Sequence, residues 1–281
     1  MFQTILNGLL LGLFYALLAA GFSLILGTAR VLFFAHAEIY MLGAVVTYSL
    51  ISKSGLPYPA AIILGTLSIG LLGVIIERGL FRHFRGQGLP FAIAMLALGM
   101  ILSNSALLTF GERTRGLPSP FAGNIELFGA SLTVERLVIM VVSVAIILGL
   151  YFFLQRTRPG RAIRAVSQDE EAAASLGIDI NHTTRLTFLI ATAVAAAAGG
   201  LTLPVYSVSA YMGSTVFMLT LMVVIWGGLG SFPGAIIGGL VLGITQSLLY
   251  TYIGAQTVVF LFLIVIVMII IRPRGILGGR A

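Results

Sequence analysis

The chain has 281 residues, of which 59% are hydrophobic and only 9% are charged. A typical soluble domain has about 25% charged residues, and the mean hydropathy of this chain is +1.09. Sixteen Lys and Arg residues and nine Asp and Glu residues cannot cover the surface of a soluble protein of this length. The composition therefore excludes a water-soluble globular protein and predicts a protein surrounded largely by lipid.

The net charge of +7 and the isoelectric point of about 10.1 would point to nucleic acid in a soluble protein. In a membrane protein, excess arginine instead marks the cytoplasmic loops, so no nucleic acid partner is expected. The chain has no cysteine and three histidines in separate segments, which argues against a disulfide framework and a metal site. Because the first charged residue is Arg30, the apolar N-terminus is predicted to be a retained span and not a cleaved signal.

Nine stretches are apolar over roughly the 20 residues that a helical membrane span needs. The second stretch carries His36 and Glu38, so it is predicted to be broken or partly re-entrant. We expect an all-α polytopic transmembrane helix bundle of about 8–10 spans that forms a single domain over residues 1–281. The predicted spans are 4–27, 32–52, 58–77, 90–110, 134–155, 186–207, 216–230, 234–251 and 256–271.

Charge in the connecting segments predicts the orientation. Segments 78–88 and 156–185 and the C-terminal tail are rich in arginine, whereas segment 111–136 balances arginine against glutamate. By the positive-inside rule the first three are cytoplasmic and the fourth lies outside. The predicted spans between them agree with this assignment, which puts the C-terminus in the cytoplasm and the N-terminus outside.

Glycine is abundant, with 34 residues, and small residues let helices approach closely in lipid. The densest run surrounds Ser231-Phe232-Pro233. It has two interpretations, close helix packing with a tight turn or a broken helix that lines a pathway. The residues predicted to break or pack helices here are Gly228, Gly230, Gly234 and Gly238.

The polar segment 156–185 is too short to fold alone. Within it, Asp169, Glu170 and Glu171 suit the first turn of a helix, and Gly177 is a natural stop. We therefore predict a two-turn helix over 169–176. Such a short helix is ordered by its own bundle or by docking into a partner's groove, and a solvated connector is the alternative.

Four motifs in this order resemble a known family. Glu171-Ala172-Ala173-x-x-x-Gly177 resembles the EAA loop with which ABC importer permeases contact their ATPase, although the usual Ile-x-Leu-Pro ending is absent. Three other runs resemble the second-span motif, the Gly-rich turn and the C-terminal signature of branched-chain amino acid ABC permeases of the LivH type. They are Phe34-Ala35-His36-Ala37-Glu38-x-Tyr40-Met41-Leu42-Gly43-Ala44, Gly227-Gly228-Leu229-Gly230-Ser231-x-x-Gly234-Ala235-x-x-Gly238-Gly239 and Arg272-Pro273-x-Gly275-Ile276-Leu277-Gly278.

The resemblance covers nearly the whole chain, with three departures. Phe33, Ala37 and Gln246 stand where the family usually has Asn, Gly and Glu. The resemblance implies a permease of the type II ABC importer kind in a bacterial-type inner membrane. It would form half of the translocation path for branched-chain or other small apolar amino acids. The departures leave urea, short amides and aromatic acids open as substrates.

The same resemblance implies partners. The chain lacks the Gly-x-x-x-x-Gly-Lys-[Ser/Thr] motif, so we expect no enzyme activity and no cofactor in this chain. ATP and Mg would be bound by separate ATPase subunits. A second permease subunit, LivM-like or another copy, and an extracytoplasmic substrate-binding protein would complete the importer. The predicted ATPase-docking residues are Gly160, Arg161, Arg164, Asp169, Glu171, Ala172, Ala173 and Gly177.

Polar residues at membrane depth are costly and usually face the bundle interior, so they are the candidates for the pathway. Those candidates are His36, Glu38, Tyr40, Asn104 and Gln246. His36 and Glu38 are two residues apart and cannot share a helix face, which predicts a kink; an interfacial contact between Glu38 and Arg30 is the alternative.

Two other functional classes remain as rivals to the ABC permease. An ion-coupled secondary transporter would need buried acids, and Glu38 is the only obvious one in the sequence. A structural membrane scaffold would tolerate changes in the Gly-rich turn. A catalytic role is not expected, because no serine has a His and a carboxylate in a recognisable frame.

Overall fold

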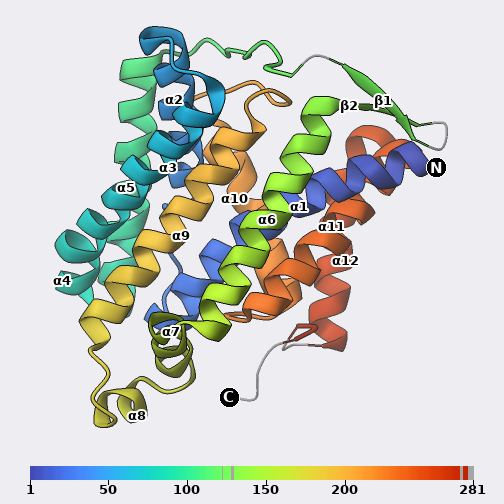
Figure 1. Ribbon diagram of the computed structural model, residues 1–281. Coiled ribbons are helices and arrows are strands. Elements are labelled where there is room, and N and C mark those ends of the chain that lie inside the picture. The colour runs from blue at the N-terminus through green and yellow to red at the C-terminus, as the bar shows by residue number, and fades with distance from the viewer. Residues whose placement is uncertain (122, 128–129, 273–274, 278–281) are drawn as a thin grey trace.

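The computed structural model describes residues 1–121, 123–127, 130–272 and 275–277, and within them the chain forms a bundle of long helices (Figure 1). Nine helices of membrane scale follow one another among the described residues, and each overlaps one of the nine predicted stretches. They are α1 (Phe2–Ala29), α2 (His36–Ser54), α3 (Tyr58–Ile76), α5 (Gly88–Phe110), α6 (Val134–Arg156), α9 (Ile180–Thr202), α10 (Met212–Gly227), α11 (Phe232–Ile253) and α12 (Thr257–Ile271).

Shorter elements connect these helices. A π-helical turn (Glu77–Phe81) and α4 (Arg82–Phe84) continue α3, and a 3-10 turn (Gly254–Gln256) separates α11 from α12. The polar segment between α6 and α9 folds as α7 (Arg158–Gln168) and α8 (Glu170–Ser175). An antiparallel hairpin of β1 (Asn124–Leu127) and β2 (Ala130–Thr133), with Asn124 opposite Thr133, precedes α6. The all-α bundle is confirmed, and this hairpin is a small addition to it.

Six helical stretches in the described part of the chain are long and apolar enough to cross a membrane on their own. The last of them, Phe232–Ile271, contains both α11 and α12. The more polar α2 and the shorter α10 are not among these six. At 16 residues, α10 is only roughly 24 Å long, less than the thickness of the hydrocarbon core.

The sixth span begins earlier and ends earlier than the predicted range 186–207. A side-chain oxygen of Asp179 accepts a hydrogen bond of 3.0 Å from the His182 N–H and so caps α9 at Ile180. Pro204 follows the end of α9 by two residues, where a helix cannot readily continue. The polar first turn of α9 was therefore missed by a search for apolar residues.

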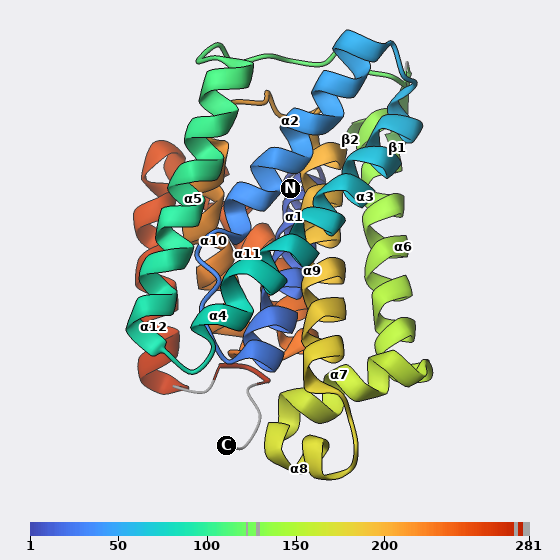
Figure 2. The same cartoon turned by 90° about the vertical axis from the view of Figure 1, so that its left-hand side faces the viewer.

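Helix α1 runs through the centre of the bundle, and α9 is the other well-buried helix (Figure 2). Of the most apolar 18-residue window in each, 83% of α1 and 72% of α9 is buried, against 17% to 33% in the other four candidate spans. The outer helices expose large apolar side chains, among them Ile63, Leu67 and Leu71 on α3. Such surfaces suit lipid or another membrane-embedded protein.

Close backbone contact joins α1 to α11. Gly8 and Gly12 lie four residues apart on one face of α1, and they meet α11 around Gly239 and Gly243. A Cβ atom on Gly8 would lie 2.7 Å from the Ile244 Cα, and one on Gly12 would lie 2.8 Å from the Leu240 Cα. Only glycine fits at these two positions without moving the helices apart.

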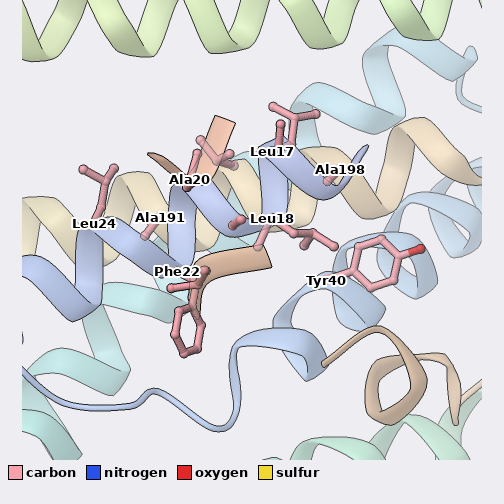
Figure 3. Packing of buried hydrophobic residues seen from close by; sticks show 14 of the residues in the cluster. Leu17, Leu18, Ala20, Phe22, Leu24, Tyr40, Ala191 and Ala198 are labelled. Carbon is pink, nitrogen blue, oxygen red and sulfur yellow. The ribbon is translucent and has the colours of Figure 1, made fainter. Parts of the chain in front are cut away.

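The other side of the α1 core is formed with α9 and α2. Figure 3 shows Leu17, Leu18 and Phe22 of α1 beside Ala191 and Ala198 of α9, with Tyr40 of α2 next to them. Small alanines on α9 let the two central helices approach, while the larger side chains of α1 fill the space between them.

The second span is partly re-entrant, which is one of the two predicted forms, whereas α2 itself is an uninterrupted helix and has no break between His36 and Glu38. After α1 ends, residues 30–35 turn back along it, and His36 begins α2 beside the middle of α1. The His36 Nε2 atom lies 3.1 Å from the carbonyl oxygen of Leu18. Helix α2 therefore starts at membrane depth and not at the membrane surface.

Replacing Gly12 by Leu is expected to destabilise the bundle, because the new side chain would collide with the backbone of α11. Overpacking of this kind costs about 1–3 kcal/mol or more. The matched control is Gly149→Leu on α6, where a Cβ meets open space. We expect a clearly lower melting temperature for the purified Gly12→Leu protein than for Gly149→Leu, and equal melting temperatures would contradict the packing described here.

Candidate translocation groove and docking loop

The two ends of the bundle differ in charge. Helices α7 and α8 lie at one end, and the hairpin and the N-terminus lie at the other (Figure 1). The hairpin end also holds the C-terminal end of α2, whose last turn carries Lys53, and the segment before α6, where arginine and glutamate balance. The element ends found at the α7–α8 end are the C-terminal ends of α1, α6 and α12, the π-helical turn with α4, α7 and the start of α9. These segments and the residues next to them carry Arg30, Arg78, Arg82, Arg85, Arg156, Arg158, Arg161, Arg164, Arg185 and Arg272.

A groove of about 310 Å³ lies between the start of α2, α5 and α10. It brings together two of the predicted pathway residues, Glu38 and Asn104. Its walls are otherwise mainly apolar, and the rings of Phe34 and Phe217 pack with their centroids 5.8 Å apart. Glu38 is the only charged residue among those that line the groove.

Two glycines make room for the Glu38 side chain. A Cβ atom on Gly213 of α10 would lie 2.7 Å from the Glu38 Cδ, and one on Gly99 of α5 would lie 3.7 Å from its Cγ. The Oε2 atom of Glu38 is buried and has no hydrogen-bond partner.

The alternative prediction, a contact between Glu38 and Arg30, is wrong. The re-entrant segment carries Glu38 away from the membrane surface. Arg30 Nη2 instead donates a hydrogen bond of 3.2 Å to the carbonyl oxygen of Gln168.

His36 and Tyr40 lie inside the bundle and do not line this groove. The His36 ring is 1% exposed and packs edge-on against Phe22 and Phe33, with ring centroids 5.5 and 6.0 Å away. The Tyr40 hydroxyl is 3.1 Å from the Thr202 Oγ1 on α9. Their geometry is that of polar core residues whose hydrogen bonds fix α2 against α1 and α9.

Gln246 belongs to a different cavity of about 440 Å³ toward the hairpin end. The Tyr15 hydroxyl donates to Gln246 Oε1 at 2.7 Å, and in the same cavity Arg136 Nη1 donates to Asn7 Oδ1 at 2.8 Å. The five predicted pathway residues therefore do not form one site. Two line the groove, two are in the core, and Gln246 lies apart.

The expectation that Glu38 is the only buried acid is wrong. Glu77 and Glu135 are 1% and 7% exposed and are more buried than Glu38. Glu77 Oε2 lies 3.6 Å from Arg185 Nε, which ties the π-helical turn after α3 to the start of α9. Because Glu77 is followed directly by Arg78 and then by a charged segment, the sequence did not distinguish it from a surface residue.

The polar segment holds its first helix against α6. Thr157 Oγ1 accepts a hydrogen bond of 3.0 Å from Gly160 N and caps α7, which the sequence analysis did not predict. Gly160 itself abuts the carbonyl group of Phe153, and Arg164 Nε donates to the Leu154 carbonyl oxygen at 3.0 Å. Of the three predicted docking residues in α7, Gly160 and Arg164 thus contact α6 and are not free for a partner. Arg161 is exposed.

The predicted two-turn helix is α8, and it projects at the tip of this end of the molecule (Figure 2). Asp169 Oδ1 accepts a hydrogen bond from Ala172 N at 3.0 Å, Ala173 is buried, and Gly177 has a φ of 81° just after the helix. Glu171 and Ala172 are exposed. After the loop, the hydrogen bond from the His182 N–H lowers the pKa of Asp179 below its usual value, which favours the charged cap at neutral pH.

Leu176 is a candidate contact residue that the sequence analysis missed. Its side chain is 82% exposed at the end of α8. A large apolar side chain at the tip of a polar loop is the kind of group that a partner's pocket buries. The signal was available in the sequence as a single leucine between the polar residues of the loop and Gly177.

An ion pair joins α8 to the beginning of α5. Arg85, in the turn before α5, pairs with Glu170 of α8, and its Nη1 also lies 3.3 Å from Asn181 Oδ1. The side chains of the pair are 30% and 37% exposed, so solvent weakens the attraction. The pair still connects the exposed loop directly to a helix that lines the groove. It could not be predicted from the sequence, because Arg85 and Glu170 are far apart along the chain.

The Gly-rich run forms a tight turn between α10 and α11. Gly228 and Gly230 have positive φ angles of 109° and 77°, and Ser231 Oγ accepts a hydrogen bond from Gly234 N at 3.2 Å. Gly234 packs on Gly227, and a Cβ on Gly238 would lie 2.9 Å from the Val223 carbonyl oxygen. Among the described residues this geometry corresponds to the packing-and-turn interpretation and not to a helix broken at depth.

The C-terminal segment closes over this turn. The backbone N–H groups of Ile276 and Leu277 donate to the carbonyl oxygens of Trp226 and Gly227 at 2.9 and 3.0 Å. The last part of the C-terminal motif is thereby placed beside the Gly-rich motif. Pro273 and Gly278 of that motif lie outside the described residues.

Comparison with known proteins agrees with this architecture. The solved structure of PsaBC from Streptococcus pneumoniae in complex with Fab has a TM-score of 0.50 and 19% sequence identity, over 95% of this chain and 91% of that chain, which shows a shared fold. The high-affinity branched-chain amino acid transport system permease protein LivH of Escherichia coli K12 is 36% identical over 98% of this chain and 95% of its own length.

Further relatives cover similar shares. The corresponding permease protein BraD of Pseudomonas aeruginosa is 32% identical over 98% of this chain and 95% of its own length. A family model described as branched-chain amino acid transport system / permease component matches residues 4–272. The chain therefore belongs to the family of branched-chain amino acid transport system permease components.

Proposed function

We propose that this chain is the permease subunit of an ATP-driven importer and forms half of the translocation path for branched-chain or other small apolar amino acids. The observation that carries the proposal is the match to the permease family over residues 4–272, with relatives named as branched-chain amino acid permeases over nearly their whole length. Those relatives are transporters and not enzymes, so ATP and Mg are assigned to separate ATPase subunits.

The groove between α5 and α10 is the proposed path. A carboxylate at membrane depth needs water or protein around it, yet the groove that holds Glu38 opens on the outside of this bundle. Exposure of this face to lipid would leave Glu38 beside hydrocarbon. A second permease subunit, LivM-like or another copy of this chain, is therefore assigned to cover the groove and complete a water-filled path.

The arginine-rich α7–α8 end is assigned to the cytoplasm, since cytoplasmic loops carry the excess of positive charge. This assignment puts the C-terminus inside and the N-terminus outside the inner membrane. The ATPase would bind the exposed tip formed by Glu171, Ala172 and Leu176. The extracytoplasmic substrate-binding protein would bind the hairpin end.

Reversing the charge at the tip of α8 tests the docking assignment. Glu171→Arg is expected to weaken the association of the ATPase with the tagged chain by about tenfold, because a disrupted interface contact that costs about 1.4 kcal/mol lowers the affinity by that factor. Quantitative mass spectrometry of the gently extracted complex measures this. The control is Glu126→Arg on the exposed hairpin, and equal recovery of the ATPase with both variants would refute the assignment.

Single cysteines test whether the groove is a water-filled path, and this chain has no native cysteine that would compete for the label. Asn104→Cys and Met218→Cys, in the groove, are compared with Leu67→Cys on the apolar face of α3. In the assembled importer, a charged thiol reagent is expected to label the groove positions at least about tenfold faster, because the reactive thiolate forms in water. Equal slow labelling at all three positions would place the path elsewhere.

A further inference from the structure

We propose that Glu38 receives the α-ammonium group of a zwitterionic amino acid in the groove between α2, α5 and α10, while Phe34, Phe217 and Met218 contact its apolar side chain. The inference rests on the proposed function and deepens it, because it distinguishes amino acids from the neutral and anionic substrates that the sequence leaves open. It concerns a binding site for substrate within this chain and names the group that selects it.

The surroundings of Glu38 call for a cationic partner. Its Oε2 atom is buried without a hydrogen bond, and neither of the two ion pairs in the described residues includes it. Buried polar atoms in folded proteins nearly always have a partner, and an unpaired one needs an explanation. An ammonium group would supply both hydrogen bonds and the opposite charge, which is the pairing that makes a carboxylate tolerable at this depth.

The position of the carboxylate is set by the backbone. Helix α2 begins beside the middle of α1, and Glu38 stands in its first turn. Gly213, in the first turn of α10, touches the carboxylate, so a second helix also begins at Glu38. The N-terminal end of α10, which carries positive partial charge, therefore lies beside the carboxylate.

The rest of the groove fits the remaining parts of a small apolar amino acid. The volume of about 310 Å³ is at the lower end of the range for small-molecule sites. The rings of Phe34 and Phe217 line the groove together with Glu38, and Met95 and Met218 add adaptable side chains. Asn104 and Ser214 provide neutral polar groups at the rim, where a substrate carboxylate would be placed without a second negative side chain nearby.

This arrangement predicts which ligands are excluded. An aromatic acid or another carboxylate without an amine would bring its charge toward Glu38 and would be repelled. Urea and short amides have no charge to pair with it. An amine that keeps the branched side chain but lacks the carboxylate would still bind, since its ammonium group makes the principal contact.

The test measures binding of radiolabelled leucine to the permease–ATPase complex in lipid nanodiscs, without the substrate-binding protein. Leucine and leucinamide are expected to displace the label, and 4-methylpentanoate, which has no amine, is expected not to. In the Glu38→Gln variant the leucine affinity should fall by about tenfold or more, with a smaller loss in Glu38→Asp. Glu126→Gln on the hairpin is the control and should bind as the original chain does.

The outcomes separate this inference from the proposed function. Displacement by 4-methylpentanoate as strong as that by leucine, undetectable leucine binding to the original complex, or unchanged affinity in Glu38→Gln would each overturn the ammonium site. The competition series on the original complex gives its answer even if Glu38→Gln fails to fold. ATP-dependent leucine uptake by the full importer is measured alongside, and its absence in the original complex would instead reject the proposed function.

Discussion

The backbone contact between α1 and α11 is the interaction on which the rest of this bundle depends. In lipid, helices gain nothing from hiding apolar surface from water, so association rests on close packing and on hydrogen bonds between helices. Glycines at four-residue spacing on both helices allow that packing, and Ser247 Oγ adds a hydrogen bond of 2.7 Å to the Thr4 carbonyl oxygen. The small residues of α9 extend the same arrangement to the other side of α1, which makes α1 the buried axis of the molecule.

Around this closely packed centre the backbone is irregular at two points. The chain turns back after α1, and both α2 and α10 begin next to Glu38 instead of at a membrane surface. Non-helical backbone at this depth is tolerated only where protein or water surrounds it. The contact of His36 with the Leu18 carbonyl oxygen and that of Tyr40 with Thr202 hold the start of α2 in place. Two polar residues that were candidates for the pathway therefore fix α2 against α1 and α9.

An ion pair connects the α7–α8 segment to a helix that lines the groove. Arg85 pairs with Glu170 on α8 and stands immediately before α5, whose Asn104 and Met95 line the groove. The pair thus links α8 to the start of α5 directly, without a contact through α1. Because the pair is partly exposed, its contribution to the free energy of unfolding is small.

Much of the architecture could be predicted from the sequence, because hydropathy locates the spans along the chain. The nine stretches, the break before α2 and the two-turn helix α8 all followed from local composition and capping residues. Hydropathy does not say which face of a span points inward when the helix is apolar all round. For that reason the pathway candidates were separated by the fold into a groove, a core and a second cavity.

Contacts between residues far apart in the sequence could not be predicted from local composition either. Glu77 is buried because Arg185, from a distant helix, reaches it, and Arg85 meets Glu170 only in the folded chain. The polar first turn of α9 and the whole of α7 were missed because a polar helix at a membrane end has no apolar signal; their capping residues, Asp179 and Thr157, were the available clues.

The central claim is that ATP, and not an ion gradient, drives amino acid uptake through this chain. The most direct measurement is leucine uptake into proteoliposomes that contain the purified complex, with the substrate-binding protein outside and ATP on the side of the ATPase. Uptake that requires hydrolysable ATP and persists when a protonophore and sodium-free buffer remove ion gradients is the predicted result. Uptake by the chain alone that needs no ATP and stops when the gradients are removed would contradict it.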